Sequence, residues 1–411
     1  MPTVMAAATG SRRRGRRDPP AAAYLAGFVF LGLGSTFAGP ALSFLRGRAG
    51  TDDAGIGLVF VGSSIGYVIG SLVAGRIVDR GAGHRWWSIA IGVALVAVGV
   101  VSATTSLGLI VALFAVLGFM LASCDTSGNT LVLWARPDDP GPLLHGLHLC
   151  FAVGALLAPL LVNRALAWSD SLWPLLIPLG LLGAYCVSQF VRRPAPVRTR
   201  VAPAAHPGAA AVRTGQLVAL CAFFVVYVGV ETGVAGWVHS YVEQIGYGGA
   251  GMATGVTTIF WTGFVVGRVL AIPLSRRIRP ALMLAGALGA LIVAATVFVV
   301  IADPGIGLWF VMFVIGLVIA PQFASMIAFA EEHLTLGGKA TAAFIASAGL
   351  GGLVVPWLLG VLFDARGAEV LPSVVLVSAL VAAAVAGLAG WLVLRDVAQR
   401  PPATSTNAPV T

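Results

Sequence analysis

Residues 66–80 read GYVIGSLVAGRIVDR, and residues 263–277 read GFVVGRVLAIPLSRR. The two stretches lie 197 positions apart and share two glycines, an alanine and a terminal arginine at matching positions. The same offset pairs residues in two other apolar runs: Gly32 with Gly229, Ala38 with Ala235, Gly39 with Gly236, Ser43 with Ser240, Gly154 with Gly351, and Pro159 with Pro356. One offset that serves three separate runs indicates an internal duplication of the chain.

The composition is that of a membrane protein. Of the 411 residues, 58% are apolar and 10% are charged, whereas a soluble chain carries about 25% charged residues. This excludes a disordered chain, a nucleic-acid-binding module and an ordinary water-soluble enzyme. Because a bilayer-spanning helix needs about 20 mostly apolar residues, the apolar share is enough for roughly a dozen spans.

Clusters of charged and turn-forming residues divide the sequence into twelve predicted spans. These are 22–45, 55–78, 86–103, 107–134, 144–163, 171–191, 216–242, 252–275, 281–301, 305–330, 340–363 and 371–394. Together with the duplication, they predict an all-α membrane protein with twelve transmembrane helices in two six-helix repeats. The predicted domains are a disordered basic tail at 1–20, a six-helix bundle at 21–191, a linker at 192–215, a second six-helix bundle at 216–395 and a tail at 396–411.

The distribution of basic residues predicts the orientation. With both termini in the cytoplasm, cytoplasmic segments hold 19 of the 25 basic residues, and two more, Arg76 and Arg268, lie near cytoplasmic helix ends. The remaining four are Arg46, Arg48, Arg164 and Arg366. Basic residues concentrate on the cytoplasmic side of membrane proteins. We therefore expect a multi-pass protein of the plasma (inner) membrane, with an arginine-rich N-terminus that is held inside and not cleaved as a signal.

The loop after the second span, GRIVDRGAGHR (75–85), combines acidic and basic residues at a predicted cytoplasmic helix end. Asp79, Arg80 and Arg85 can form a charge network between helix ends that breaks when two halves of a protein rock. The alternative is a basic turn that only follows the charge distribution described above.

Asp125 lies within the fourth predicted span, and Asn129 follows four residues later on the same helix face. A carboxyl group at membrane depth costs roughly 2.5–3.5 kcal/mol, so it should face a polar cavity or a partner. Burial favours the protonated form, which suits a residue that couples transport to protons. The alternative is a structural carboxyl group that ties two helices together.

Glu231 lies near the middle of the seventh predicted span, with Tyr227 four residues earlier on the same face. Each half thus carries one intramembrane acid, and a carboxyl group beside an aromatic ring suits a polyhydroxylated or cationic ligand. His148 in the fifth span and Gln322, the repeat counterpart of Asp125, are further candidates. For these two residues the alternative is hydrogen bonding between helices. His145 and His239 lie closer to span ends, where we expect the membrane interface.

Several of these segments resemble known transporters. The loop at 75–85 is similar to the major facilitator signature G-x-L-x-D-R-x-G-R-[RK], with one additional residue and with His84 in place of an arginine. Further segments resemble the first, fourth, fifth and seventh spans of the fucose permease and sodium-dependent glucose transporter branch of the major facilitator superfamily. They are Gly39-Pro40-Ala41-Leu42, Asp125-x-x-x-Asn129 through Trp134, Leu147-His148-x-x-Phe151-x-x-Gly154-Ala155 with Pro159, and Tyr227-Val228-Gly229-Val230-Glu231-Thr232 with Gly236-Trp237 and Tyr241.

This resemblance implies the major facilitator fold and uptake of a hexose or similar polyol driven by a proton or sodium gradient. It implies roles in substrate binding and coupling for Asp125 and Asn129, and in substrate binding for His148, Tyr227 and Glu231. The implied partners are a small-molecule substrate and the lipid bilayer, with no nucleic acid, and we expect a monomer.

No cofactor or metal is expected beyond the coupling ion, H⁺ or Na⁺. The sequence contains no GxxxxGK[ST] motif for ATP. The four cysteines lie inside apolar runs without the spacing of a metal site or a disulfide framework.

Three other functions compete with uptake of a sugar. A proton-coupled exporter of drugs or amphipathic metabolites is the main alternative, because Phe44 stands in the first span where the glucose-type branch tends to carry Asp. A membrane-embedded enzyme is disfavoured, since no nucleophile–base arrangement or metal cluster is visible. A non-transporting sensor would bind a ligand without moving it.

Overall fold

The computed structural model describes residues 21–136, 141–197, 210–301, 305–335 and 338–398. Within these ranges, twelve helical segments are long and apolar enough to cross a membrane, which confirms the predicted all-α membrane fold. The predicted tail at 1–20 lies outside the described residues, as do residues 198–209 of the predicted linker and 399–411 of the predicted second tail.

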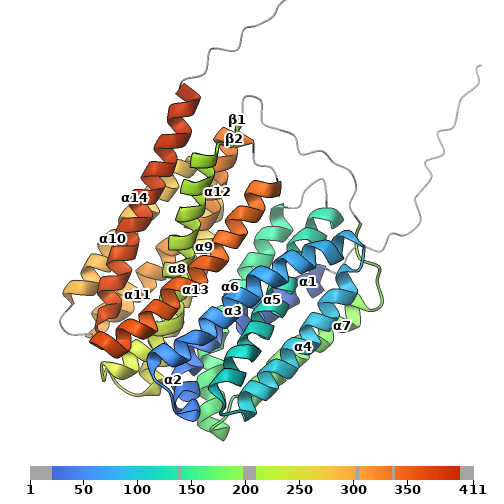
Figure 1. Ribbon diagram of the computed structural model, residues 1–411, viewed down its shortest axis with the longest axis vertical. Helices are drawn as coiled ribbons and strands as arrows, with labels where there is room; N and C mark the ends of the chain where they lie inside the picture. Colours follow the sequence, from blue (N-terminus) through green and yellow to red (C-terminus); the bar gives the residue numbers. More distant parts are fainter. Residues whose placement is uncertain (1–20, 137–140, 198–209, 302–304, 336–337, 399–411) are drawn as a thin grey trace, which may run out of the picture.

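The helices form two successive groups of six spans. The first group contains α1 (Ala21–Thr36) with α2 (Ala38–Ala49), α3 (Asp53–Asp79), α4 (Gly83–Ala103), α5 (Leu107–Ala135), α6 (Gly141–Ser169), and η1 (Trp173–Leu175) with α7 (Leu176–Phe190). The second contains α8 (Thr214–Gln244), α9 (Ala250–Ser275), α10 (Pro280–Val300), α11 (Gly305–Ile319) with α12 (Gln322–His333), α13 (Gly338–Arg366) and α14 (Val370–Ala398). Figure 1 shows each group as a bundle, and α3 and α13 lie side by side where the two bundles meet.

Glycines at matching positions make the same helix crossings in both bundles. A Cβ atom on Gly66 would lie 1.9 Å from the carbonyl oxygen of Ala115, and one on Gly263 would lie 2.0 Å from that of Phe313. The α3–α5 and α9–α11 contacts therefore bring backbone against backbone, as small residues allow in membranes. Gly154 and Gly351 make the α6–α1 and α13–α8 crossings in the same way, each with a Cβ position 2.2 Å from a carbonyl oxygen. The duplicated glycines therefore make equivalent helix contacts in the two bundles.

Two spans that were predicted as continuous are broken. Predicted span 22–45 turns at Phe37 between α1 and α2, and predicted span 305–330 turns at Ala320 and Pro321 between α11 and α12. Pro40 and Pro321 each lack the N–H group that would bond to the carbonyl group four residues earlier. The missing hydrogen bonds weaken the helix at both breaks.

A small piece of sheet adds to the helical fold. β1 (Ala210–Ala211) pairs in parallel with β2 (Leu334–Thr335), and this joins the segment before α8 to the segment after α12. The sequence predicted no strand there, because two residues carry no alternating pattern. We call the end of the molecule where α7 ends and α8 begins the linker end, and the opposite end the distal end.

Candidate functional site

Asp125 lies at the centre of a hydrogen-bonded group in the first bundle. The Tyr67 hydroxyl of α3 donates to Oδ2 at 2.5 Å, and the Asn129 amide donates to Oδ1 at 2.8 Å. Tyr67 is held in place because the neighbouring Gly66 and Gly70 press α3 directly onto α5. Both carboxyl oxygens accept from donors, which is the pattern that suits an ionised carboxylate.

Glu231 lies in the second bundle beside an aromatic cluster. It is half-buried on α8, and the ring of Tyr227, one helical turn earlier, stacks on Phe223 with 5.9 Å between ring centroids. The Tyr227 hydroxyl is buried and interacts electrostatically with Glu231, without a well-formed hydrogen bond to any described residue. Tyr227 and Glu231 thus lie on one face of α8, and the Tyr227 ring packs against Phe223.

Arg268 of α9 faces the same region. Its charge interacts with the Glu231 carboxylate and acts on the His148 imidazole, and its guanidinium group lies 5.0 Å from the ring centroid of Phe264. His148 and Arg268 each lie seven residues from the linker-end terminus of their helices, since α6 begins at Gly141 and α9 ends at Ser275. His148 is exposed as a residue and meets Phe28 edge-on at 6.1 Å.

Polar groups of the two bundles approach each other across the interface. Tyr67 bonds to Asp125 and also interacts electrostatically with Glu231, while His148 of the first bundle interacts with Arg268 of the second. Asp125, Glu231, Tyr67 and Arg268 are all half-buried. Hydroxyl, carboxylate, imidazole and guanidinium groups of both bundles thus interact electrostatically across the interface.

Gln322 is buried at the break in the tenth span. It begins α12 directly after the Pro321 break, it is 1% exposed, and its amide donates to the Val318 carbonyl oxygen at 2.9 Å. Its amide nitrogen therefore bridges the two parts of the broken tenth span.

The loop between α3 and α4 contains the predicted gating residues. Asp79, Arg80 and Arg85 are exposed, and none has an ion-pair partner within 4.0 Å among the described residues. The neighbouring His84 is buried, with Nε2 2.7 Å from the Tyr24 hydroxyl and Nδ1 3.0 Å from the Arg193 carbonyl oxygen. Since a carbonyl oxygen only accepts, Nδ1 carries a proton, and His84 fastens α4 to α1 and to the end of α7.

The bundles are joined at the distal end. The Asp364 carboxylate of α13 accepts from the backbone N–H groups of Asp53 and Ala54, at 3.0 and 2.6 Å, and so binds the first turn of α3. The Asp53 carboxylate in turn accepts from Arg46 at 2.5 Å and from Gln244 at 2.9 Å. We call this set the distal latch, formed by Arg46, Asp53, Ala54, Gln244 and Asp364.

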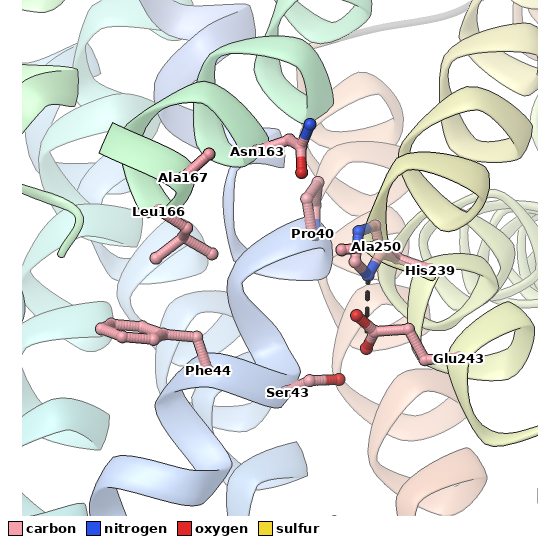
Figure 2. Close-up of a pocket in the computed structure, with 9 residues that line it drawn as sticks. All are labelled: Pro40, Ser43, Phe44, Asn163, Leu166, Ala167, His239, Glu243 and Ala250. Carbon is pink, nitrogen blue, oxygen red and sulfur yellow. Dashed lines mark ion pairs between the residues drawn. The ribbon is translucent and has the colours of Figure 1, made fainter. Parts of the chain in front are cut away.

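A pocket of about 310 Å³ lies beside the distal latch, between the bundles (Figure 2). Residues from α2, α6, α8 and α9 form it: Pro40, Ser43, Phe44, Asn163, Leu166, Ala167, His239, Glu243 and Ala250. His239 is 5% exposed, and its Nδ1 atom lies 3.6 Å from the Glu243 carboxylate. The expected interfacial His239 is therefore packed between the bundles, and none of the predicted binding residues lines this pocket.

Two polar residues of this region, Tyr67 and Arg268, are not among the predicted site residues. Arg268 was explained as a basic residue near a helix end, although it stands within an apolar run, seven residues before the end of α9. An ionisable group inside a span is itself a signal for a functional site. Tyr67 carried a weaker signal, since only its position beside two packing glycines sets it apart.

Known proteins share the sequence family and the fold of this chain. Residues 24–344 match the Major Facilitator Superfamily. The sodium-dependent glucose transporter 1 of Homo sapiens is 28% identical over 375 residues, which cover 82% of this chain and 72% of that protein.

Two solved structures share the fold. A D-xylose–proton symporter has a TM-score of 0.70 at 16% identity, covering 88% of this chain and 96% of that one. The nucleoside transporter NupG has a TM-score of 0.69 at 16% identity, covering 89% and 98%. These relatives are transporters, in agreement with the prediction of a transporter over an enzyme.

Proposed function

Because this chain belongs to the Major Facilitator Superfamily, we propose that it is a secondary active transporter that moves a sugar or similar polyol by cation-coupled alternating access. H⁺ or Na⁺ is the coupling ion. The protein works as a monomer in the plasma (inner) membrane, with both termini in the cytoplasm. The name of the glucose-transporting relative and the sugar substrate of the solved symporter support this substrate class.

One observation carries the proposal. Tyr67 bonds to the acid of the first bundle and interacts electrostatically with the acid of the second. A ligand between Asp125 and Glu231 would therefore contact both halves, as alternating access requires. Asn129 and His148 would bind substrate hydroxyl groups, and Tyr227 would support Glu231.

The distal latch gives a direction to the conformational change. Contacts between the bundles at Asp53 and Asp364 close the distal end, which the distribution of basic residues assigns to the outside. The substrate would then enter or leave from the linker end in this conformation, and rocking would break the latch. Asp79, Arg80 and Arg85 would pair with partners at the linker end only in the opposite conformation.

The experiment is uptake of labelled hexose into proteoliposomes under an imposed proton or sodium gradient. We expect Asp125→Asn and Glu231→Gln to abolish accumulation above equilibrium, because each removes a group that binds the coupling cation. Glu332→Gln, at an exposed position near the end of α12, is the matched control. If both single variants accumulate hexose like the wild type, the assignment of the two acids is wrong.

The direction of flux separates uptake from export. With the gradient reversed, an importer should release a preloaded sugar. Extrusion of an amphipathic compound in exchange for protons, with no movement of sugar, would instead identify a proton-coupled exporter.

A further inference from the structure

Arg268 is an intramembrane cation that makes no direct ion pair with any described residue. Its Nε atom is buried and has no hydrogen-bond partner, and no carboxylate oxygen lies within 4.0 Å of its guanidinium group among the described residues. Within the described part of the chain, the ring of Phe264 stacks on it. A buried donor without an acceptor is costly, more so when it is charged. A bound ligand with an acceptor would relieve that cost.

The surroundings of Arg268 belong to the proposed binding region. Its charge interacts with Glu231 and Tyr227 of α8 and with His148 of α6. The duplication places Ser71 at the matching position of the first half, 197 residues earlier, and its hydroxyl is also buried, with no hydrogen-bond partner among the residues that the structure describes. The positive charge of Arg268 is therefore specific to the second half and is not a product of the duplication.

We propose that Arg268 is the specificity-determining residue for an anionic substrate, and that the transported solute is a polyhydroxylated monocarboxylate such as a hexuronate. A guanidinium group presents two parallel N–H donors that match a carboxylate. This inference rests on the proposed function, because the substrate hydroxyl groups would bind to Asn129, His148 and the carboxylates.

The charges of the site limit the substrate to the one negative charge that a single coupling cation can offset. With both acids ionised, Asp125, Glu231 and Arg268 sum to one negative charge. A carboxylate adds a second, which one proton or sodium ion at Glu231 would offset. A dianionic phosphate would need a second coupling cation to offset its second negative charge. The coupling cation and the substrate anion would thus enter as a pair, which avoids an unpaired charge in a low-dielectric site.

The test compares three ligands of nearly the same shape: labelled D-glucuronate, D-glucuronamide and D-glucose. Each is offered to proteoliposomes with the intact chain, under the same inward proton and sodium gradients. We expect glucuronate to be preferred over glucuronamide by about ten- to a hundredfold in kcat/KM, the range for hydrogen bonds to a charged group.

Variants at Arg268 give a readout that a purely structural role would not produce. Arg268→Gln should raise the KM for glucuronate and leave that for glucuronamide within about threefold. Arg268→Lys should keep part of the preference, because it keeps the charge and loses the paired donors. Arg276→Gln, at the exposed C-cap of the same helix, should behave like the wild type. Thermal unfolding in detergent identifies any variant that fails to fold, and the wild-type ligand series decides the question without variants.

Each result has a defined meaning. Preference for glucuronate that is lost in Arg268→Gln supports the proposal. Uptake of glucose without preference for glucuronate overturns the anionic substrate and leaves the proposed sugar transporter standing. Equal losses for all three ligands in a folded Arg268→Gln protein overturn a role in specificity. If none of the three ligands moves, both this inference and the proposed function fail.

Discussion

Asp125 illustrates how a single residue in the membrane acquires a defined partner. The sequence placed Asn129 on its helix face, and the structure has that hydrogen bond at 2.8 Å. The second donor, Tyr67, comes from another helix. Donors on both oxygens stabilise the ionised form, and their release on protonation would change how α3 and α5 are linked.

Tyr67→Phe removes only the hydroxyl group that donates to Asp125. We expect gradient-driven accumulation in proteoliposomes to fall by about tenfold, because a hydrogen bond to a charged group is lost and the ring remains. Tyr185→Phe, at an exposed position on α7, is the control. Unchanged accumulation in Tyr67→Phe would mean that the hydroxyl is dispensable for coupling.

At the scale of the elements, helix packing depends on glycines that the duplication repeats. Gly66 and Gly263 have no side chain at the points where α3 crosses α5 and where α9 crosses α11. The α3 crossing also positions Tyr67, so packing and the candidate site are linked through one helix. The broken spans follow from prolines that remove backbone donors.

Gly66→Ala should destabilise the first bundle, because the new Cβ would overlap a backbone oxygen that no side-chain rotation can move. The expected loss is about 1–3 kcal/mol, with a similar loss for Gly263→Ala. Gly92→Ala, which has no atom within 4 Å of the added Cβ, should be neutral. The measurement is thermal unfolding in detergent, and equal stability of all three variants would refute the packing argument.

At the scale of the whole molecule, the duplication creates contacts between equivalent residues. Ser43 and Ser240 are 197 residues apart, and their hydroxyl oxygens lie 3.4 Å apart, so equivalent positions of α2 and α8 meet at the distal end. The nearby latch adds charged contacts. If the halves rock, these contacts must separate.

In the double variant Ser43→Cys/Ser240→Cys, a disulfide between the two cysteines should therefore keep the distal end closed. We expect oxidation to form a disulfide, given the short separation of the two hydroxyl oxygens, and to stop transport reversibly. Uptake before oxidation, after oxidation and after reduction measures the effect. Each single cysteine variant is the control for oxidation elsewhere, and full transport by the cross-linked protein would show that this contact does not open.

The sequence by itself determined the twelve spans, the duplication, and the acids Asp125 and Glu231 with their neighbours one turn away. These depend on local composition and on the helical period, which a single chain displays directly. Only the tertiary structure decided which residues of different helices interact. Tyr67 bonds to Asp125, Asp364 bonds to the start of α3, and Arg268 interacts electrostatically with Glu231 and His148. It also decided that the Gln322 amide donates to a carbonyl oxygen of its own span. The physical reason is that the rotation of each helix about its axis is set by packing against its neighbours, which hydrophobicity alone does not specify.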